Sequence, residues 1–161
     1  MTNPADLARV REWMDSYPRE GWALEELPAD DPLRTRAVAA ILQHRSHDDE
    51  AIDELARYAD ALEAHQQAEE AGKVMPAPPL KRCRQYKVQI VRMKHVANDQ
   101  SACFRVDFVT DQGWSGFFDT TNPLVVEKIN KHTGLAITLV GEVIERPYDF
   151  MVKLGGPVRI V

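Results

Sequence analysis

The segment from Phe108 to Pro123, FVTDQGWSGFFDTTNP, is the part of the chain whose residue types point most directly to chemistry. It places Trp114, Phe117 and Phe118 within five residues, among glycines, aspartates and a serine. Aromatic rings serve two purposes in such a segment. They fill a hydrophobic core, or they stand at the surface as planes on which a ligand ring such as a nucleobase stacks. The orientation of each ring is therefore the first question that the sequence raises.

A second group with chemical potential is the run QHRSHDDE, residues 43–50. It places His44 and His47 three residues apart, a spacing that would allow both to bind zinc from one helix face. The acids that follow are explained equally well by capping and by the helix dipole, because they precede a helical stretch. The remaining histidines are scattered along the chain. We expect no metal and no cofactor.

Motifs of the common enzyme classes are missing from the sequence. It contains no Walker-type loop, no GxSxG and no HExxH. The segment KLGGP, residues 153–157, is typical of a turn between strands rather than of a phosphate-binding loop. We expect a non-enzymatic protein, although a site assembled from distant residues stays open at this level.

Composition is that of an ordinary globular protein, with 44% hydrophobic and 28% charged residues in 161. No apolar run approaches the ~20 residues of a membrane helix, and the N-terminus lacks the basic start and apolar core of a signal peptide. The two cysteines, Cys83 and Cys103, suggest no disulfide framework. We therefore expect a cytoplasmic protein with reduced thiols and no membrane partner.

The net charge of −5 conceals an asymmetry between the two halves. Residues 1–79 carry 8 Lys and Arg against 17 Asp and Glu, a net charge of −9. Residues 80–161 carry 12 against 8, a net charge of +4. An acidic half joined to a basic half suggests two units with different partners, or two halves that dock on each other.

The first half has helical periodicity. Asn3 is a candidate N-cap with Pro4 at the first helical position, which predicts a helix through Tyr17. A short connection over 18–28 follows, with room for one helical turn, and Asp30 or Asp31 then caps a second helix over 32–45. The expected buried faces of these two helices are Leu7, Val10, Met14 and Tyr17 in the first, and Leu33, Val38, Ile41 and Leu42 in the second.

The sequence predicts a third, longer helix from about residue 50 to Gly72. Its apolar residues Ile52, Leu55, Ala59 and Leu62 are spaced 3-4-3, as in a coiled-coil seam. The seam is too narrow to stand alone, so the helix must pack on a partner. Whether that partner is a second copy of the chain, as in a homo-oligomer, stays open.

The segment KVMPAPPL, residues 73–80, contains three prolines in four positions and cannot continue a helix. Such a composition favours an extended, semi-rigid spacer. The predicted organisation is an acidic helical domain over 1–72, a proline-rich linker over 73–80 and a β-rich domain over 81–161.

In the second half of the chain, the spacing of apolar residues changes from the helical period to the two-residue period of strands. Residues 86–96 and 102–110 alternate as strands do, with a slip between Ile90 and Val91 that indicates a bulge or bend. A third strand follows the turn near Gly113. Residues 122–134 then have helical periodicity, with Asn122 as the cap. The last two strands are predicted over 135–146 and 148–154, joined at Arg146 and Pro147, with a short extension after them.

This order of elements resembles the OB-fold, a small five-stranded Greek-key barrel. The resemblance covers residues 84–161 and rests on the order, the long bent first strand and the glycine in VGEVIER. The predicted class is α+β, with an N-terminal helical unit followed by a small five-stranded antiparallel OB-like β-barrel that has one helix between strands three and four. A different five-stranded α+β sheet would give the same order.

The length of the loop between strands two and three decides which ring faces outward. A three-residue loop, DQG, places Gly113 in the left-handed conformation and pairs Val106 with Phe118. Trp114 and Phe118 then face the core, and Phe117 faces outward. A two-residue loop, QG, exchanges the two faces. We favour the three-residue loop, because glycine ends it where a left-handed conformation is needed.

The resemblance implies a binding site, since the outer face of strands two and three in OB-folds binds oligonucleotides or oligosaccharides. The candidate stacking ring is Phe117, or Trp114 under the other register. The candidate phosphate contacts are Lys87, Arg92, Lys94 and Arg105, with Tyr148 and Lys153 closing the groove. Asp107, Asp111 and Asp119 lie close by in the sequence and would repel phosphates.

Two functions are compatible with these features. The first is a single-stranded nucleic-acid-binding accessory protein, whose acidic helical domain recruits a partner or regulates access. The second is a protein-interaction module, such as a small inhibitor, an assembly factor or a phage or mobile-element accessory protein. It would bind a protein through the helical half or the aromatic sheet face. A stripe of cations around an exposed ring would favour the first, and cations paired with helical-domain acids would favour the second.

Overall fold

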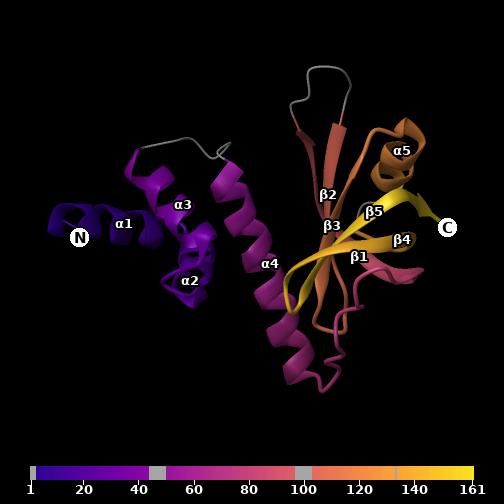
Figure 1. Cartoon of the computed structure of the whole chain (residues 1–161), viewed down its shortest axis with the longest axis horizontal. Coiled ribbons are helices and arrows are strands. Elements are labelled where there is room, and N and C mark those ends of the chain that lie inside the picture. The colour runs from indigo at the N-terminus through magenta and orange to yellow at the C-terminus, as the bar shows by residue number, and fades with distance from the viewer. Residues whose placement is uncertain (1–2, 44–49, 97–102, 133) are drawn as a thin grey trace. The chain divides into compact units, whose positions relative to one another are not determined.

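The computed structural model describes residues 3–43, 50–96, 103–132 and 134–161. The chain forms two compact units, Met1–Leu62 and Glu63–Val161. Helices build the first unit, and a closed five-stranded barrel with one helix builds most of the second (Figure 1). The predicted α+β class is confirmed.

The helical unit contains α1 (Pro4–Ser16), α2 (Pro18–Glu26), α3 (Pro32–Leu42) and the first part of α4 (Glu50–Glu70). Proline occupies the first position of α1, α2 and α3, where its missing N–H costs nothing. The side chain of Asn3 accepts a hydrogen bond from Ala5 N at 2.9 Å, and that of Asp31 accepts from Leu33 N at 2.9 Å. Both predicted caps are confirmed.

Two details of this unit differ from the sequence expectation. The apolar face of α1 contains no fully buried residue, and Leu7 is 46% exposed. The segment predicted as a short connection forms α2 instead, with Ala23 and Leu24 in the core. Gly21 explains this packing, because a Cβ there would lie only 2.9 Å from Met14 Cβ. The missing side chain lets α1 and α2 approach closely.

The predicted apolar seam of α4 is buried at Ile52, Leu55 and Ala59 and half-buried at Leu62. The helix ends near Gly72, as predicted, and Gly72 just beyond its last residue has φ +68°. Gly72 N donates to Glu69 O at 3.1 Å, and the following amide donates to Ala68 O at 2.9 Å. This pair of bonds is a Schellman motif, which requires the left-handed conformation that glycine adopts readily.

The division between the units falls within α4, between Leu62 and Glu63, before the proline-rich segment. Residues 73–80 are extended, as predicted, but they pack on the barrel rather than spanning free space. Met75 N donates to Gln112 O at 2.8 Å, and Ala77 is buried in the barrel core. The prolines fix an extended path, and that path follows the barrel surface.

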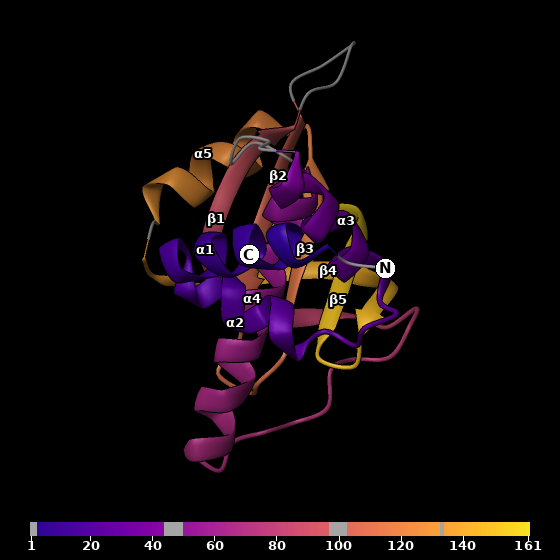
Figure 2. The same ribbon diagram turned by 90° about the vertical axis from the view of Figure 1, so that its left-hand side faces the viewer.

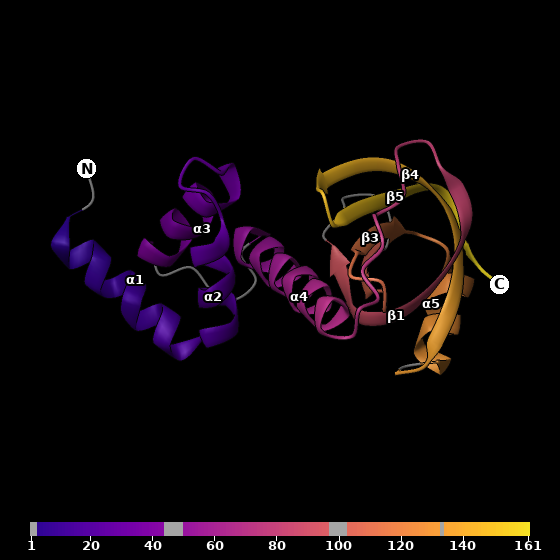
Figure 3. The same ribbon diagram turned by 90° about the horizontal axis from the view of Figure 1, so that it is seen from below.

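The barrel consists of β1 (Cys83–Val96), β2 (Cys103–Val109), β3 (Ser115–Thr120), β4 (Ala136–Tyr148) and β5 (Met151–Ile160), with α5 (Pro123–Lys131) between β3 and β4. The strand order is β1-β2-β3-β5-β4, and β4 closes the barrel on β1. Figure 3 shows the strands curving around the interior. The arrangement is OB-like, but it is not wholly antiparallel as predicted, because β3 and β5 pair in parallel.

Strand β1 pairs with two different neighbours. Its first half, from Cys83 to Gln89, pairs with β4, and its second half pairs with β2 (Figure 2). Gln89 belongs to both ladders, since it pairs with Val109 and with Ala136. The register then shifts between Ile90 and Arg92, which confirms the predicted bulge.

The hairpin of β2 and β3 has the register of the three-residue loop. Val106 pairs with Phe118 and Asp107 pairs with Phe117. Gly113 has φ +87°, and Thr110 N donates to Trp114 O at 3.1 Å. The favoured loop is therefore confirmed, and the two-residue alternative is wrong.

The last hairpin differs from the prediction. β4 continues through Pro147 to Tyr148, and the turn lies at Asp149 and Phe150. The ladder with β5 shifts register between Glu145 and Tyr148. Proline is accommodated there, because an irregular ladder leaves some N–H groups unused. The predicted short extension at the C-terminal end instead continues β5 to Ile160.

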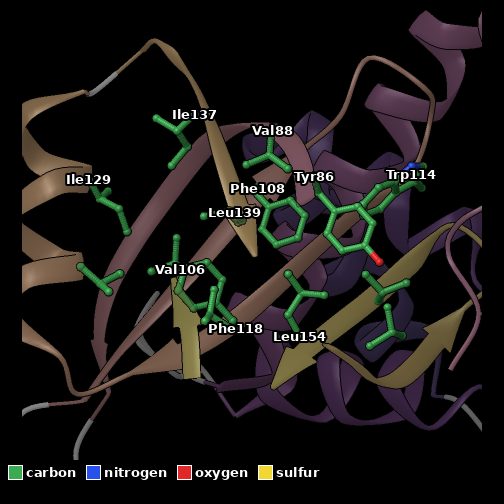
Figure 4. Close-up of a cluster of buried hydrophobic side chains, with 14 of the residues drawn as sticks. Tyr86, Val88, Val106, Phe108, Trp114, Phe118, Ile129, Ile137, Leu139 and Leu154 are labelled. Atoms are coloured by element: carbon green, nitrogen blue, oxygen red, sulfur yellow. The ribbon is translucent and has the colours of Figure 1, made fainter. Parts of the chain in front are cut away.

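The barrel core is filled from all five strands and from α5 (Figure 4). Asn122 Oδ1 accepts from Leu124 N at 3.0 Å and caps α5, whose Val125 and Ile129 enter the core. Trp114 is only 4% exposed. Its ring meets Tyr86 edge-on at 5.4 Å, and both rings are visible together in Figure 4.

Tyr86 links this core to alkaline stability. Burial raises the pKa of its hydroxyl, and Arg84 opposes part of that effect. A raised pKa in the folded state means that the contribution to stability is complete below the unfolded value of about 10 and is lost as pH rises above it. We expect the urea midpoint to fall between about pH 9 and 11, and to fall less in Tyr86→Phe. An identical fall in both proteins would show that this hydroxyl does not couple ionisation to folding.

Candidate nucleic-acid interface

The strand register assembles most of the predicted site on the outer face of β1, β2, β3 and β5. Arg92 pairs with Asp107, Asp107 with Phe117, and Phe117 with Lys153, which forms one row across four strands. A second row runs beside it, formed by Lys94, Arg105 and Asp119. Neighbours in such rows share a face, so their side chains interact directly.

Three of the cations in these rows, Arg92, Arg105 and Lys153, are paired with acids of the barrel itself. Arg92 Nη1 lies 2.9 Å from Asp107 Oδ2. Arg105 donates hydrogen bonds to both carboxylate oxygens of Asp119, at 2.8 and 3.0 Å, and Lys153 Nζ lies 4.0 Å from the same carboxylate. A bidentate arginine–carboxylate pair has strong directional hydrogen bonds. These charges are therefore largely used within the fold.

Phe117 faces outward as predicted, but its ring is not open. It is 8% exposed, with Arg105 Cζ 5.6 Å and Lys153 Nζ 5.9 Å from the ring centroid. Both distances lie in the cation–π range. The other candidate ring, Trp114, belongs to the core rather than to the outer face. Neither ring therefore presents a free plane for stacking.

Polar side chains on the outer face of the β2–β3 hairpin are also shielded from solvent. Asp107 is 4% exposed and Ser115 is 3% exposed. The Ser115 hydroxyl has no hydrogen-bond partner among the residues that the structure describes, and an unpaired buried hydroxyl is costly. A buried acid, a covered ring and an orphan hydroxyl distinguish this face from an open basic groove.

A set of rings at the turn between β4 and β5 is more accessible. Tyr148 and Phe150 are half-buried and nearly parallel, with centroids 6.2 Å apart and an interplanar angle of 15°. His65 of α4 meets Phe150 at 5.6 Å, and its Nδ1 lies 3.2 Å from Gly113 O. Tyr148 was a predicted site residue. Phe150 was missed, because the sequence placed it inside a strand rather than in a turn.

A different group of cations stands apart from the paired rows. We call it the basic strip, and it consists of Lys81, Arg82, Arg84, Lys87 and Arg159. All five are exposed, and none forms an ion pair with another residue in the described part of the chain. Only Lys87 was predicted as a site residue. Lys81, Arg82 and Arg84 could have been found from the run KRCR, residues 81–84, whereas Arg159 stands alone in the sequence.

The pairing of β1, β4 and β5 brings Arg159 onto the same outer face as Lys87, whereas Arg84 lies on the other face of β1, at the exposed start of the strand. Gln85 pairs with Val140, and Val140 pairs with Arg159. Adjacent strands are ~4.8 Å apart, so Arg159 lies about 10 Å across the sheet from β1. The polar side chains Gln85 and Thr138 lie on the same outer face as Lys87. Glu142, paired with Cys83, places an acid at the edge of this surface.

Lys81 begins the basic strip in a strained conformation. Its φ of 66° lies in the left-handed region, which residues other than glycine rarely adopt. Two hydrogen bonds hold it there, from Lys81 N to Val143 O at 2.8 Å and from Val143 N to Arg82 O at 3.0 Å. The fold thus fixes the point at which the chain delivers its consecutive cations to the barrel.

The predicted zinc candidates His44 and His47 lie outside the described residues. Within the described ranges, no three His, Cys, Asp or Glu side chains come together as metal ligands would. The helices in those ranges are all too short or too polar to cross a bilayer.

Comparison with known proteins gives no further guidance. Family models, curated proteins and solved structures were compared with the chain, and none of them matches it.

Proposed function

We propose that this protein binds single-stranded nucleic acid as a non-enzymatic accessory factor, along the basic strip of its OB-like barrel. The observation that supports this proposal is the contrast between two sets of cations. Arg92 and Arg105 are neutralised by barrel acids, whereas the strip cations are exposed and without ion pairs in the described chain. Unpaired cations displace the counterions of phosphates, which is the main source of affinity for nucleic acid.

The predicted outer face of β2 and β3 then has a different role. Its ion pairs and the cations over Phe117 tie β1, β2, β3 and β5 together, and so stabilise the barrel. Base stacking falls instead to the half-buried pair Tyr148 and Phe150. Stacking on an aromatic side chain is tolerant of sequence and contributes ~1–3 kcal/mol per base.

The helical unit suits recruitment of a partner or regulation rather than binding of nucleic acid. Residues 1–62 carry 7 Lys and Arg against 14 Asp and Glu, a net charge of −7. Such a surface repels phosphates. The exposed Leu7 on α1 offers an apolar contact for a protein partner.

The test is a fluorescence anisotropy titration of a labelled oligothymidylate of about 20 nucleotides, longer than the ~4–16 that one OB fold covers. We expect binding that weakens as salt rises. Arg84→Glu combined with Lys87→Glu should weaken it at least ~10-fold at low salt and reduce the salt slope by about 0.7 for each lost phosphate contact. The matched control is Lys73→Glu combined with Lys131→Glu, which changes the net charge equally outside the strip.

Two results would contradict the proposal. Equal losses in both double variants would show that total charge, rather than the strip, determines affinity. No binding by the wild type at low salt, where attraction is strongest, would remove nucleic acid as the ligand. The protein-interaction alternative would then stand, with the helical unit and the outer face of β2 and β3 as the surfaces to examine.

A further inference from the structure

A pocket of about 260 Å³ lies in the second unit, beside the basic strip. Gln89 lines it, the residue at which β1 changes partner from β4 to β2. Ala136 on β4 and Ala64 on α4 line it. Because these walls carry only methyl groups, the space between them stays unfilled. The hollow is thus a consequence of the strand exchange and of the small residues around it.

The size of the pocket restricts its ligand. Pockets for drug-sized molecules have ~300–1,000 Å³, so this one suits a single flat ring system. Apolar surface comes from Val88 and Val109. The remaining lining suits a ligand with a polar edge, because it includes several hydrogen-bonding side chains.

Those side chains are Gln67, Lys87, Gln89 and Asp111. All four are exposed, and within the described chain none of them forms a side-chain hydrogen bond or ion pair. Each amide offers donors and an acceptor, whereas the carboxylate only accepts. Lys87 belongs both to the pocket and to the basic strip. A phosphate on the strip and its own base in the pocket can therefore be bound together.

We infer that this pocket binds one guanine base of a single strand held on the basic strip, an inference that rests on the proposed function. The Asp111 carboxylate determines which nucleobase the pocket prefers. Guanine presents two neighbouring N–H donors, N1–H and N2–H, on its Watson–Crick edge, and one carboxylate accepts from both. Adenine, cytosine and thymine place an acceptor beside each donor on that edge, which would face the carboxylate unfavourably. The amides of Gln67 and Gln89 then suit the guanine O6 and N7 acceptors.

The test uses the full chain and three labelled strands that differ at one central base of an oligothymidylate: thymine, guanine or hypoxanthine. Hypoxanthine lacks the N2 amino group. A good bidentate contact gives roughly tenfold discrimination, so we expect about tenfold tighter binding of the guanine strand than of either other strand. Asp111→Asn should remove this preference, so that the three strands bind with equal affinity. Asp149→Asn, an exposed control on the β4–β5 turn, should keep the preference.

Equal affinity for all three strands would overturn the guanine site and leave nucleic-acid binding intact. If no strand binds, the proposed function fails, and the pocket is judged separately by NMR titration with guanosine and adenosine 5′-monophosphate. Shifts confined to the backbone amides of Gln89 and Asp111 and seen only with the guanosine nucleotide would support the pocket. The same spectra with both nucleotides, or no shifts, would overturn it.

Discussion

Replacing Phe118 with alanine is expected to lower the free energy of unfolding of the barrel by about 3–5 kcal/mol. Phe118 is fully buried, and its ring lies 6.3 Å from that of Phe108 in the centre of the core. Its strand partner Val106 is also fully buried. Closely packed neighbours on both sides cannot collapse into the space left, so the loss includes a cavity term.

The adjacent residue provides the control. Phe117→Ala removes an equal volume from the outer face, where the ring contacts Arg105 and Lys153 rather than the core. We expect a loss of about 1–2 kcal/mol, since cation–π contacts and partial packing contribute less. Urea unfolding followed by Trp114 fluorescence, with Trp13 and Trp22 replaced by phenylalanine, measures both. Equal losses would mean that the two faces of β3 are not distinguished as the register requires.

Gly116→Ala is the second substitution for which we expect a large effect, a loss of about 3 kcal/mol. A Cβ at Gly116 would lie 2.5 Å from Phe108 Cζ and 2.8 Å from the carbonyl oxygen of Val152. The second clash is with backbone. Val152 is the parallel partner of Gly116, so relief would open the pairing of β3 and β5.

Gly141→Ala on β4 is the matched control, because its new Cβ would meet only side chains, at 3.3–3.4 Å. We expect that variant to lose less than about 1 kcal/mol. Differential scanning calorimetry of both proteins would measure the comparison. A Gly116→Ala protein as stable as Gly141→Ala would show that β3 and β5 tolerate a wider separation.

Local signals predicted much of this fold. Gly113 determined the loop of the β2–β3 hairpin, because a left-handed residue has one suitable place in a three-residue turn. The neighbouring apolar pair Ile90 and Val91 marked the bulge, because a two-residue period cannot place both side chains inward. Asn122 located the start of α5, because its side chain caps a backbone N–H two residues ahead.

Long-range contacts explain what the sequence did not predict. Pro147 indicated the end of a strand, but a register shift in the partner ladder accommodates it. The 73–80 segment was predicted as a spacer, and tertiary contacts place it on the barrel, namely the hydrogen bond of Met75 with Gln112 and the burial of Ala77 in the core.

The candidate site depended on long-range contacts in the same way. Arg92 and Arg105 have the residue type of phosphate ligands, but their acids come from other strands and are invisible to a local pattern. Lys87 and the other cations of the basic strip differ from Arg92 and Arg105 in one respect. The strand pairing places no acid within ion-pair distance of them in the described chain.

The double pairing of β1 has a consequence for the order of events during synthesis. The second half of β1 meets its partner β2 soon after both leave the ribosome, since Val96 pairs with Cys103. The first half of β1 stays unpaired for much longer, because its partner is β4, where Cys83 pairs with Glu142. Until β4 emerges, Tyr86 and Val88 have no barrel to enter, and unburied apolar strands of this kind are prone to aggregate. The period between the synthesis of β2 and that of β4 is therefore when the nascent chain is most exposed to misfolding.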